Sequence, residues 1–323
     1  MEERSRVAVI GGGAFGTAVA NLLAENFEEV LLWCYEKEVA SEINELLENR
    51  TFLRGIKLNG KIRATHDLRK VVSFSPLIFE AIPVKHLRIT LTPIKNMFSR
   101  DQIWVVLSKG VEGESFMFPS QILEDLAGKS LNVAALSGPT FAIELVQKFF
   151  SAADLAVKDL ETGKYLQSVL ECNYFRVFVQ TDLMGVQFGG AIKNVIALAI
   201  GMASGWNAGK NMEAFLLSSI FTESLKLLDF LGGKRETLFG LSGIGDLFLT
   251  VGSKLSKNRR AGEFLGRGGS LSDLSNQYVA LPEGINTIEA IHNYVTKNGI
   301  KVPLLEKIYR IVFEGESFAD FFK

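Results

Sequence analysis

The apolar positions in the first half of the chain form short runs that alternate with longer stretches of helical periodicity. The runs are rich in β-branched residues and predict strands at Arg6–Ile10, Val30–Trp33, Leu77–Ala81, Ile103–Leu107, Val133–Leu136 and Phe175–Val179. Helices are predicted between most of them, at Ala14–Asn26, Glu36–Glu48, Lys85–Met97, Phe118–Leu126 and Leu160–Leu170. Strands that are separated by helices favour parallel βαβ units and an open α/β sheet covered on both faces.

The pattern changes near residue 180, where apolar residues begin to recur at helical spacing and no strand signal returns. Pro303 is well placed to open the last long helix, and Gly266–Ser270 (GRGGS) is expected to be a surface loop. We therefore predict an α/β domain over residues 1–180 and an all-α helical domain over residues 181–323. The length of 323 residues suits two domains.

Composition and charge indicate an ordinary folded protein, with 47% hydrophobic and 22% charged residues. The 35 basic and 36 acidic side chains leave a formal charge of −1, which argues against a general affinity for nucleic acid or acidic membranes. Cys34 and Cys172 have no CxxC spacing and no histidine at ligand spacing, which argues against a disulfide scaffold and a metal site.

No membrane or export signal is expected. The longest apolar stretch, Val195–Trp206, contains glycine and serine and is too short to span a bilayer. The N-terminus has charges but no apolar run with a cleavage site, so we expect no signal peptide. With a pI near 6.4, the cytoplasm is the expected location.

A glycine-rich segment follows the first predicted strand directly. Gly11, Gly13 and Gly16 have the GxGxxG spacing, and a predicted helix comes after them. This arrangement makes a tight turn, lets the backbone touch a pyrophosphate, and aims helix N–H groups at the phosphates. We therefore predict a Rossmann-type dinucleotide-binding domain.

Glu36 lies at the end of the second predicted strand, twenty residues after Gly16. A carboxylate in this place accepts a hydrogen bond from the adenosine ribose and repels a 2′-phosphate. NAD is therefore the expected cofactor, although Lys37 keeps NADP open. The structural alternative is that Glu36 simply faces solvent in a charged EKE run.

Polar residues follow two later strands, where ligands collect at the carboxyl edge of an open sheet. Lys109 would place an ammonium group there, suited to a phosphate or a carbonyl oxygen. A surface lysine in a turn is an equally weighted interpretation. Gly138 would allow close backbone approach, and Thr140 offers a hydroxyl donor.

The helical half contains two further candidates. Lys193 interrupts a small, apolar helix face, and burial would lower its pKa toward the range useful for general acid–base catalysis. The alternative is a lysine that extends its ammonium to the surface. The segment Ser256–Arg260 concentrates hydroxyl, amide and cationic donors and suits a phosphate, although alone it would read as a solvated basic loop.

Together these motifs resemble, in order and spacing, those of the NAD(P)-dependent glycerol-3-phosphate dehydrogenases. The matching segments are GGGAFGTAVA, NRTFLRGIKL, LSKGVEG, LSGPTFAIEL, GGAIKNVIALAIG, LFGLSGIGDLFLT and SKNRRAGEFLG. The resemblance implies a reversible hydride transfer between NAD(P)H and dihydroxyacetone phosphate that gives sn-glycerol 3-phosphate for phospholipid synthesis. It also implies a small phosphorylated substrate, a homodimer, and a substrate-binding and dimerisation role for the all-α domain.

The resemblance also implies roles for individual residues. Lys193 would be the proton donor and acceptor, with Lys109 and Asp246 as the other catalytic residues. The implied substrate-binding residues are Lys109, Gly138, Thr140, Lys193, Asp246, Thr250, Ser256, Lys257 and Asn258. The implied cofactor-binding residues are Gly11, Gly13, Ala14, Phe15, Gly16, Tyr35, Glu36, Lys109, Ala142, Lys257, Leu281 and Glu283.

The chain departs from the family pattern at several positions. Lys257 stands for an arginine, Gln187 for a glutamate, Ser204 for an aspartate, Ser219 for an arginine and Arg54 for a proline. Because lysine is a point charge without the bidentate fork of arginine, weaker binding of substrate or pyrophosphate is expected. The joint loss of a glutamate, an aspartate and an arginine suggests that one internal polar network has been replaced as a unit.

Two alternatives remain beside this interpretation. One is a related two-domain NAD-dependent hydroxyacid dehydrogenase, against which the basic Ser256–Arg260 cluster argues. The other is a catalytically weak dinucleotide-binding sensor, which would bind NADH without reducing dihydroxyacetone phosphate. The presence of Lys109, Lys193 and Asp246 argues against the sensor.

Overall fold

The structure, a computed structural model, describes residues 5–128, 131–253, 256–278 and 281–321. The chain divides into two compact units. The first comprises residues 1–108 and 119–183, and the second comprises residues 109–118 and 184–323. The short segment 109–118, which we expected in the α/β half, therefore belongs with the helices of the second unit.

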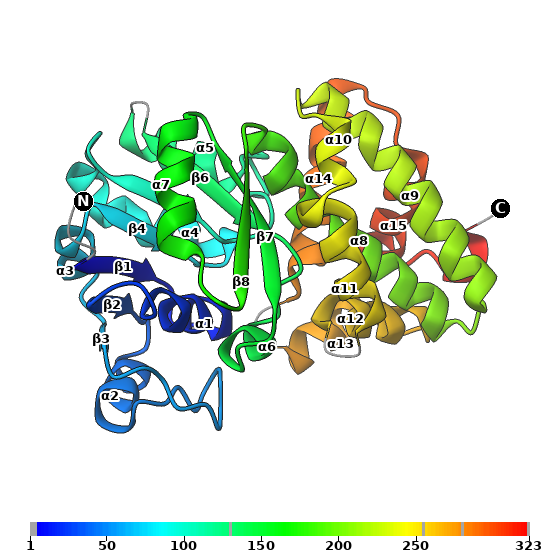
Figure 1. Ribbon diagram of the computed structural model, residues 1–323. Helices are drawn as coiled ribbons and strands as arrows, with labels where there is room; N and C mark the ends of the chain where they lie inside the picture. Colours follow the sequence, from blue (N-terminus) through cyan, green and yellow to red (C-terminus); the bar gives the residue numbers. More distant parts are fainter. Residues whose placement is uncertain (1–4, 129–130, 254–255, 279–280, 322–323) are drawn as a thin grey trace. The chain divides into compact units, whose positions relative to one another are not determined.

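The first unit is built on one eight-stranded sheet with the order β3-β2-β1-β4-β5-β6-β7-β8 (Figure 1). The strands are β1 (Arg6–Ile10), β2 (Glu29–Trp33), β3 (Ile62–Thr65), β4 (Leu77–Glu80), β5 (Ile103–Val106), β6 (Asn132–Ser137), β7 (Ser151–Val157) and β8 (Phe175–Gln180). The pairs from β3 to β6 are all parallel. Every residue of β4 is buried, as expected for a strand covered on both faces.

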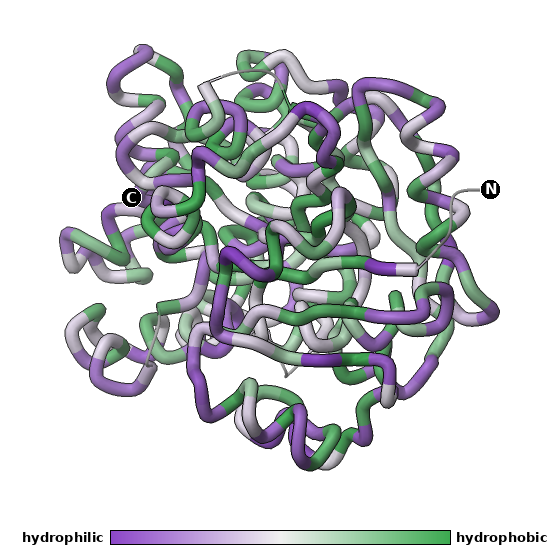
Figure 2. The backbone as a smooth tube through the Cα atoms, turned by 90° about the vertical axis from the view of Figure 1, so that its left-hand side faces the viewer, coloured by the Kyte–Doolittle hydropathy of each residue, from purple (hydrophilic) through white to green (hydrophobic). Residues whose placement is uncertain are grey.

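The helices of this unit follow the strands. They are α1 (Ala14–Leu23), α2 (Lys37–Leu46), α3 (Leu68–Phe74), α4 (Val84–Leu91), the 3₁₀ helix η1 (Thr92–Met97), α5 (Pro119–Ala127), α6 (Ala142–Val146) and α7 (Leu160–Leu170). The predicted helix Lys85–Met97 is divided between α4 and η1 because Pro93 lacks the N–H that would continue the α-helix. Figure 2 shows hydrophobic residues, in green, concentrated along the strands.

Two strands were missed by the sequence analysis, and one pairing differs from the expectation. β3 is a four-residue edge strand in which Arg63 is exposed, so its apolar signal is weak. β7 is rich in alanine and contains the buried Asp154, a composition with low strand propensity. β7 runs antiparallel to β6, so the sheet is mainly rather than wholly parallel.

The described residues of the second unit form helices and connecting loops but no strand, which confirms the predicted α/β Rossmann-type and all-α fold class. Its elements are α8 (Leu183–Gly205), α9 (Lys210–Phe230), α10 (Arg235–Leu238), the π-helical turn η2 (Leu241–Gly245), α11 (Asp246–Gly252), α12 (Lys257–Gly266), α13 (Leu271–Gln277), α14 (Glu283–Asn298), α15 (Pro303–Tyr309), the π-helical turn η3 (Arg310–Glu314) and the 3₁₀ helix η4 (Phe318–Asp320). Gly266–Ser270 connects α12 to α13, and Pro303 opens α15, as predicted.

Helix α8 is longer than the apolar stretch recognised in the sequence. Its 23 residues are long and apolar enough to cross a membrane by length and composition alone, contrary to our expectation. Most of the helix is buried inside the protein, however, which is equally typical of a core helix. Apolar residues from Phe188 to Ala203 contribute to the apolar core of the second unit.

Glycines bring the backbones of α8 and α12 into direct contact. A Cβ atom on Gly262 would lie 2.0 Å from the carbonyl oxygen of Leu198, and one on Gly266 would lie 2.0 Å from that of Met202. Gly201 on α8 has a reciprocal contact, at 2.1 Å, with a carbonyl oxygen of α12. From the Gly262 contact to the Gly266 contact, each helix advances by four residues. The two helices therefore run in the same direction, with no room for side chains between them.

We expect Gly262→Ala to destabilise the second unit by about 1–3 kcal/mol, because the added methyl group must force the two backbones apart. Gly252→Ala is the matched control, since a Cβ atom on Gly252 has nothing within 4 Å. It should change stability by less than about 0.5 kcal/mol. Urea unfolding followed by circular dichroism measures both variants. Equal stabilities of the two variants would contradict the packing described here.

Candidate functional site

The three glycines of the GxGxxG motif, in the loop after β1, have different surroundings. Gly11 adopts a φ of +125°, and a Cβ atom there would lie 2.7 Å from the carbonyl oxygen of Ala81. A Cβ atom on Gly16 would lie 1.9 Å from the carbonyl oxygen of Gly11, whereas one on Gly13 would have nothing within 4 Å. Packing therefore demands Gly11 and Gly16, while Gly13 keeps the surface of the loop open.

The open surface leads to the N-terminus of α1. This helix begins at Ala14, has no capping side chain at Gly13, and has no acidic residue in its first turn. The first N–H groups of a helix lack partners within the helix and favour an anion. Together with the cleared space at Gly13, this end of α1 fits the pyrophosphate of a dinucleotide.

Asn49 forms hydrogen bonds to the glycine loop and to α1, and the sequence analysis did not identify it as a site residue. Its Nδ2 donates to the carbonyl oxygen of Gly12 and to Oγ1 of Thr17, both at 2.8 Å. Its Oδ1 accepts from the N–H of Phe52 at 3.0 Å, and the side chain is fully buried. Asn49 lies in the motif NRTFLRGIKL, but the motif alone does not reveal which loop its amide contacts.

The other expected cofactor residues of the first unit lie directly after β2 or in the first turns of α1 and α6. Tyr35 is 78% exposed after β2, and the exposed Glu36 precedes α2 without capping it, so its carboxylate faces outward. The half-buried Phe15 belongs to the first turn of α1, and Ala142 opens α6. These positions leave the side chain of Glu36 accessible to a ribose hydroxyl.

The segment after β6 has a packing explanation beside the functional one. A Cβ atom on Gly138 would lie 2.8 Å from the carbonyl oxygen of Ala152, so the close approach of β7 requires this glycine. Thr140 is buried, and its hydroxyl donates to the carbonyl oxygen of Gly138 at 3.2 Å. Both residues belong to the first unit.

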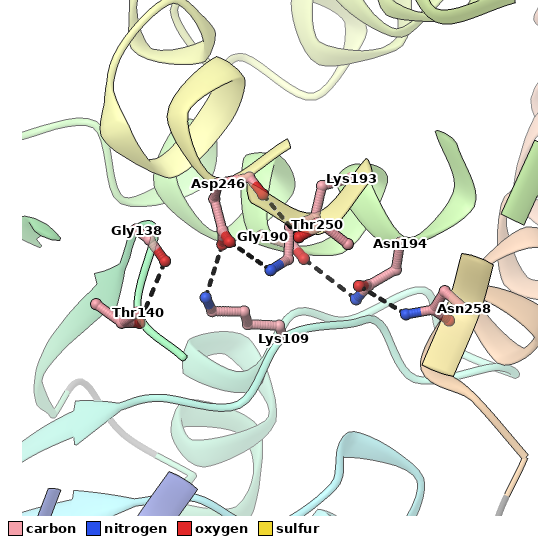
Figure 3. A network of polar contacts seen from close by, with 9 residues as sticks. All are labelled: Lys109, Gly138, Thr140, Gly190, Lys193, Asn194, Asp246, Thr250 and Asn258. Carbon is pink, nitrogen blue, oxygen red and sulfur yellow. Dashed lines mark hydrogen bonds and ion pairs between the residues drawn. The ribbon is translucent and has the colours of Figure 1, made fainter. Parts of the chain in front are cut away.

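The second unit brings three of the predicted residues into one cluster (Figure 3). Asp246 accepts from Nζ of Lys193 at 2.5 Å through Oδ1 and from Nζ of Lys109 at 2.7 Å through Oδ2. The carboxylate is 1% exposed, and the side chain of Lys193 is 11% exposed. One carboxylate thus holds two ammonium groups, which leaves the cluster with one net positive charge.

The surroundings of Lys193 change its pKa. Burial, together with the like charge of Lys109, lowers the pKa of Lys193 to about 8. The carboxylate of Asp246 acts in the opposite direction and favours the ammonium form. Lys193 is therefore mostly protonated at pH 7 and can release and recover a proton near neutral pH, as a general acid–base group requires.

A close backbone contact sets the position of Asp246. The π-helical turn η2 ends directly before Asp246, and such turns are frequent at functional sites. A Cβ atom on Gly189 of α8 would lie 2.5 Å from the carbonyl oxygen of Ser242 in that turn. Gly189 lies one helical turn before Lys193, on the same face of α8. The contact therefore presents the start of α11 to Lys193.

The start of α12 lies beside the same helix. Nδ2 of Asn258 donates to Oδ1 of Asn194 at 2.9 Å, and its Oδ1 accepts from the N–H of Gly284 at 2.8 Å. Asn194 directly follows Lys193, so the amide of Asn258 joins α8, α12 and the start of α14. The neighbouring Glu283 is the first residue of α14.

The remaining predicted residues of the second unit have mixed surroundings. The hydroxyl of Thr250 donates to the backbone oxygen of Asp246 at 2.6 Å. Ser256 caps α12 by accepting from the N–H of Arg259, and Lys257 is exposed in the first turn of that helix. Leu281 is half-buried just before α14.

Four of the five departures from the family pattern lie on helices α8, α9 and α12, whereas Arg54 is exposed in the first unit between α2 and β3. Gln187 is buried on α8, and Ser204 and Ser219 are half-buried on α8 and α9. Arg259 of α12 bonds Glu263 at 3.2 Å and lies 3.9 Å from Glu213 of α9. The joint replacement of a polar network at the three substituted positions stays a prediction.

Comparison with known proteins extends these observations over the whole chain. Residues 6–163 match the N-terminal model, and residues 182–323 the C-terminal model, of the NAD-dependent glycerol-3-phosphate dehydrogenases. The chain is 39% identical over 318 residues to the glycerol-3-phosphate dehydrogenase [NAD(P)+] of Moorella thermoacetica, covering 98% of this chain and 94% of that protein. It is 38% identical over 314 residues to that of Myxococcus xanthus, with 97% and 94% covered.

A solved structure supports the same similarity. The crystal structure of glycerol-3-phosphate dehydrogenase from Coxiella burnetii superimposes with a TM-score of 0.92 at 29% identity. The alignment covers 98% of this chain and 97% of that one. The similarity therefore includes the fold of both units.

We expect Gly13→Ala to preserve the melting temperature but to weaken NADH binding about tenfold, a loss of about 1.4 kcal/mol, because its methyl group occupies the cleared surface. Gly16→Ala should instead lower the melting temperature, since its Cβ atom meets the backbone of Gly11. Gly60→Ala, whose Cβ atom has nothing within 4 Å, is the control. Fluorescence titration and thermal unfolding measure both effects. Unchanged NADH affinity in Gly13→Ala would refute the assignment of this surface.

Proposed function

The chain belongs to the NAD-dependent glycerol-3-phosphate dehydrogenase family, and we propose that its Lys193 carries the proton in the reaction. The enzyme is an NAD(P)-dependent oxidoreductase that reduces dihydroxyacetone phosphate reversibly to sn-glycerol 3-phosphate. The main support for this role of Lys193 is its ion pair with the buried carboxylate of Asp246, which also forms an ion pair with Lys109.

Reduction of a ketone requires a hydride at the carbonyl carbon and a proton at the carbonyl oxygen. A bound NAD(P)H supplies the hydride. Lys193 supplies the proton from its Nζ, and the C=O electron pair forms the new O–H bond as the carbon accepts the hydride. In the reverse direction the neutral amine of Lys193 takes the hydroxyl proton. A pKa of about 8 suits both directions.

Asp246 and Lys109 influence the charges that take part in this proton transfer. The carboxylate of Asp246 orients Lys193 and keeps it charged before the transfer. The ammonium of Lys109 contributes a second positive charge that can stabilise negative charge developing on the carbonyl oxygen. This division of roles makes Lys193 the proton donor and Lys109 an electrostatic partner.

The phosphate of the substrate would bind at the start of α12. The exposed ammonium of Lys257 and the N-terminus of this ten-residue helix offer a positive charge and N–H donors. The buried Asn258 fixes this end of α12 beside α8. Gly138, Thr140, Thr250 and Ser256 complete the proposed substrate-binding set.

The cofactor binds to the first unit, where the glycine loop and the N-terminus of α1 receive its pyrophosphate. Glu36 would accept from the ribose hydroxyl and disfavour a 2′-phosphate, so we propose a preference for NAD over NADP. The other cofactor residues that the family resemblance proposes are Tyr35 and Ala142 in the first unit and Lys257, Leu281 and Glu283 in the second.

The homodimer and the cytoplasmic location are likewise proposals. The helical unit has exposed aromatic side chains at Phe230, Phe239 and Phe248, and such residues are frequent at protein interfaces. A dimer formed through this unit agrees with the family resemblance. The reaction product would leave the enzyme for phospholipid synthesis without any attachment of the protein to a membrane.

The proposed function predicts that the purified protein oxidises NADH in the presence of dihydroxyacetone phosphate, and oxidises NADPH more slowly. Lys193→Ala should lower kcat about 10²–10⁴-fold, because the proton donor is lost, while NADH still binds. Lys226→Ala, which removes an exposed lysine of α9, is the control and should keep wild-type turnover.

Each contradictory result has a separate meaning. Turnover that survives in Lys193→Ala would overturn the role of this lysine. NADH binding without reduction of dihydroxyacetone phosphate by the wild-type protein would favour a dinucleotide-binding sensor. Reduction of another keto acid in preference would favour the hydroxyacid dehydrogenase alternative.

A further inference from the structure

Glu80 is a fully buried carboxylic acid that the proposed reaction does not use. It is the last residue of β4, and its neighbours in the sheet are Ile10 of β1 and Val106 of β5. Oε1 accepts from the N–H of Ile82 at 2.5 Å, and Oε2 accepts from the hydroxyl of Ser108 at 2.6 Å. The carboxylate therefore ties the end of β4 to the end of β5.

The segment that Glu80 holds lies directly against the glycine loop. The N–H of Ala81 donates to the carbonyl oxygen of Ile10 at 2.8 Å. A Cβ atom on Gly11 would collide with the carbonyl group of Ala81, so no side chain fits at this position. Glu80 thus fixes the backbone of Ala81 and Ile82, which forms one wall of the turn that receives the dinucleotide.

We propose that Glu80 is a positioning residue of the dinucleotide site: in its ionised form it holds the ends of β4 and β5 in the arrangement that binds NAD(P)H, and its protonation weakens that binding. The inference rests on the proposed binding of the dinucleotide by the first unit. It adds a residue that touches neither substrate nor cofactor and acts through the backbone of residues 81 and 82.

The hydrogen bonds explain why the two forms of Glu80 differ. The ionised carboxylate accepts on both oxygens, from the Ile82 N–H on one side and from Ser108 on the other. The neutral acid donates its proton, for which the hydroxyl of Ser108 can turn to accept, but its uncharged oxygens accept more weakly than a carboxylate from the backbone N–H groups of Ile82 and Ser108. Protonation therefore weakens the tie between the two strand ends.

The carboxyl group of Glu80 gains and loses its proton near physiological pH. Burial raises the pKa of Glu80 to about 7, against the opposing effect of its hydrogen bonds to Ser108 and Ile82. Its sheet neighbours Ile10 and Val106 are apolar, and no charged group among the described residues contributes to the shift. Because the binding form is the carboxylate, affinity for NADH should rise as the pH rises through about 7.

Fluorescence titration of NADH between pH 5.5 and 8.5 tests the proposal. For the wild-type protein we expect a Kd at pH 6 that is about tenfold higher than at pH 8, because only the ionised fraction binds well. Glu80→Gln has the same shape but does not titrate, so its Kd should be raised and nearly independent of pH. Ser108→Ala removes one donor to the carboxylate, which raises the pKa of Glu80 and moves the inflection to higher pH.

Ser75→Ala is the matched control. It removes a buried hydroxyl that bonds the backbone of Arg6 at the opposite end of β4, and it should keep the wild-type pH profile. A wild-type Kd that does not vary with pH, or the same variation in Glu80→Gln, would overturn the proposal. An unmoved inflection in Ser108→Ala would also overturn it, even where Glu80→Gln fails to fold. Absence of NADH binding at every pH would overturn the proposed function and this inference together.

Discussion

The ion pairs of the buried carboxylate of Asp246 are the interaction on which the proposed chemistry depends. A charged group that is 1% exposed is stable only where it is paired, and Asp246 pairs with two ammonium groups at 2.5 and 2.7 Å. The pairing serves two purposes. It satisfies the buried charge, and it keeps Lys193 protonated although burial alone favours the neutral amine.

Backbone contacts at glycines place the groups of both units. In the helical unit, Gly189 admits the turn before Asp246, and Gly262 admits α8 against α12, so that Lys193 and Asn258 have fixed neighbours. In the sheet unit, Gly11 and Gly16 close the turn while Gly13 leaves it open. The same residue type therefore positions the proposed proton donor and clears the proposed phosphate surface.

Local patterns in the sequence were sufficient for most of the fold. The alternation of apolar runs and helical stretches predicted the sheet unit, and the loss of strand signals after residue 180 predicted the helical one. β7 was missed because its alanines and Asp154 have low strand propensity, so its place in the sheet depends on packing against β6 and β8.

The site was predictable to the extent that its motifs are local. The GxGxxG spacing and the position of Lys109 at a strand end needed only neighbouring residues. The ion pair of Lys193 with Asp246 joins residues 53 positions apart, and no periodicity relates them. Asn49 and Glu80 were missed for the same reason, since the sequence does not tell which buried backbone groups their side chains contact.

The pH dependence of kcat/KM for reduction of dihydroxyacetone phosphate tests the central claim most directly. Because the proposed reaction needs protonated Lys193, the rate of the wild-type enzyme should fall as the pH rises through about 8. In Asp246→Asn the stabilising carboxylate is lost, the pKa of Lys193 falls, and the descending limb should move to lower pH. A descending limb at the same pH in both proteins would contradict the account, because Asp246 would then have no influence on the proton that the reaction uses.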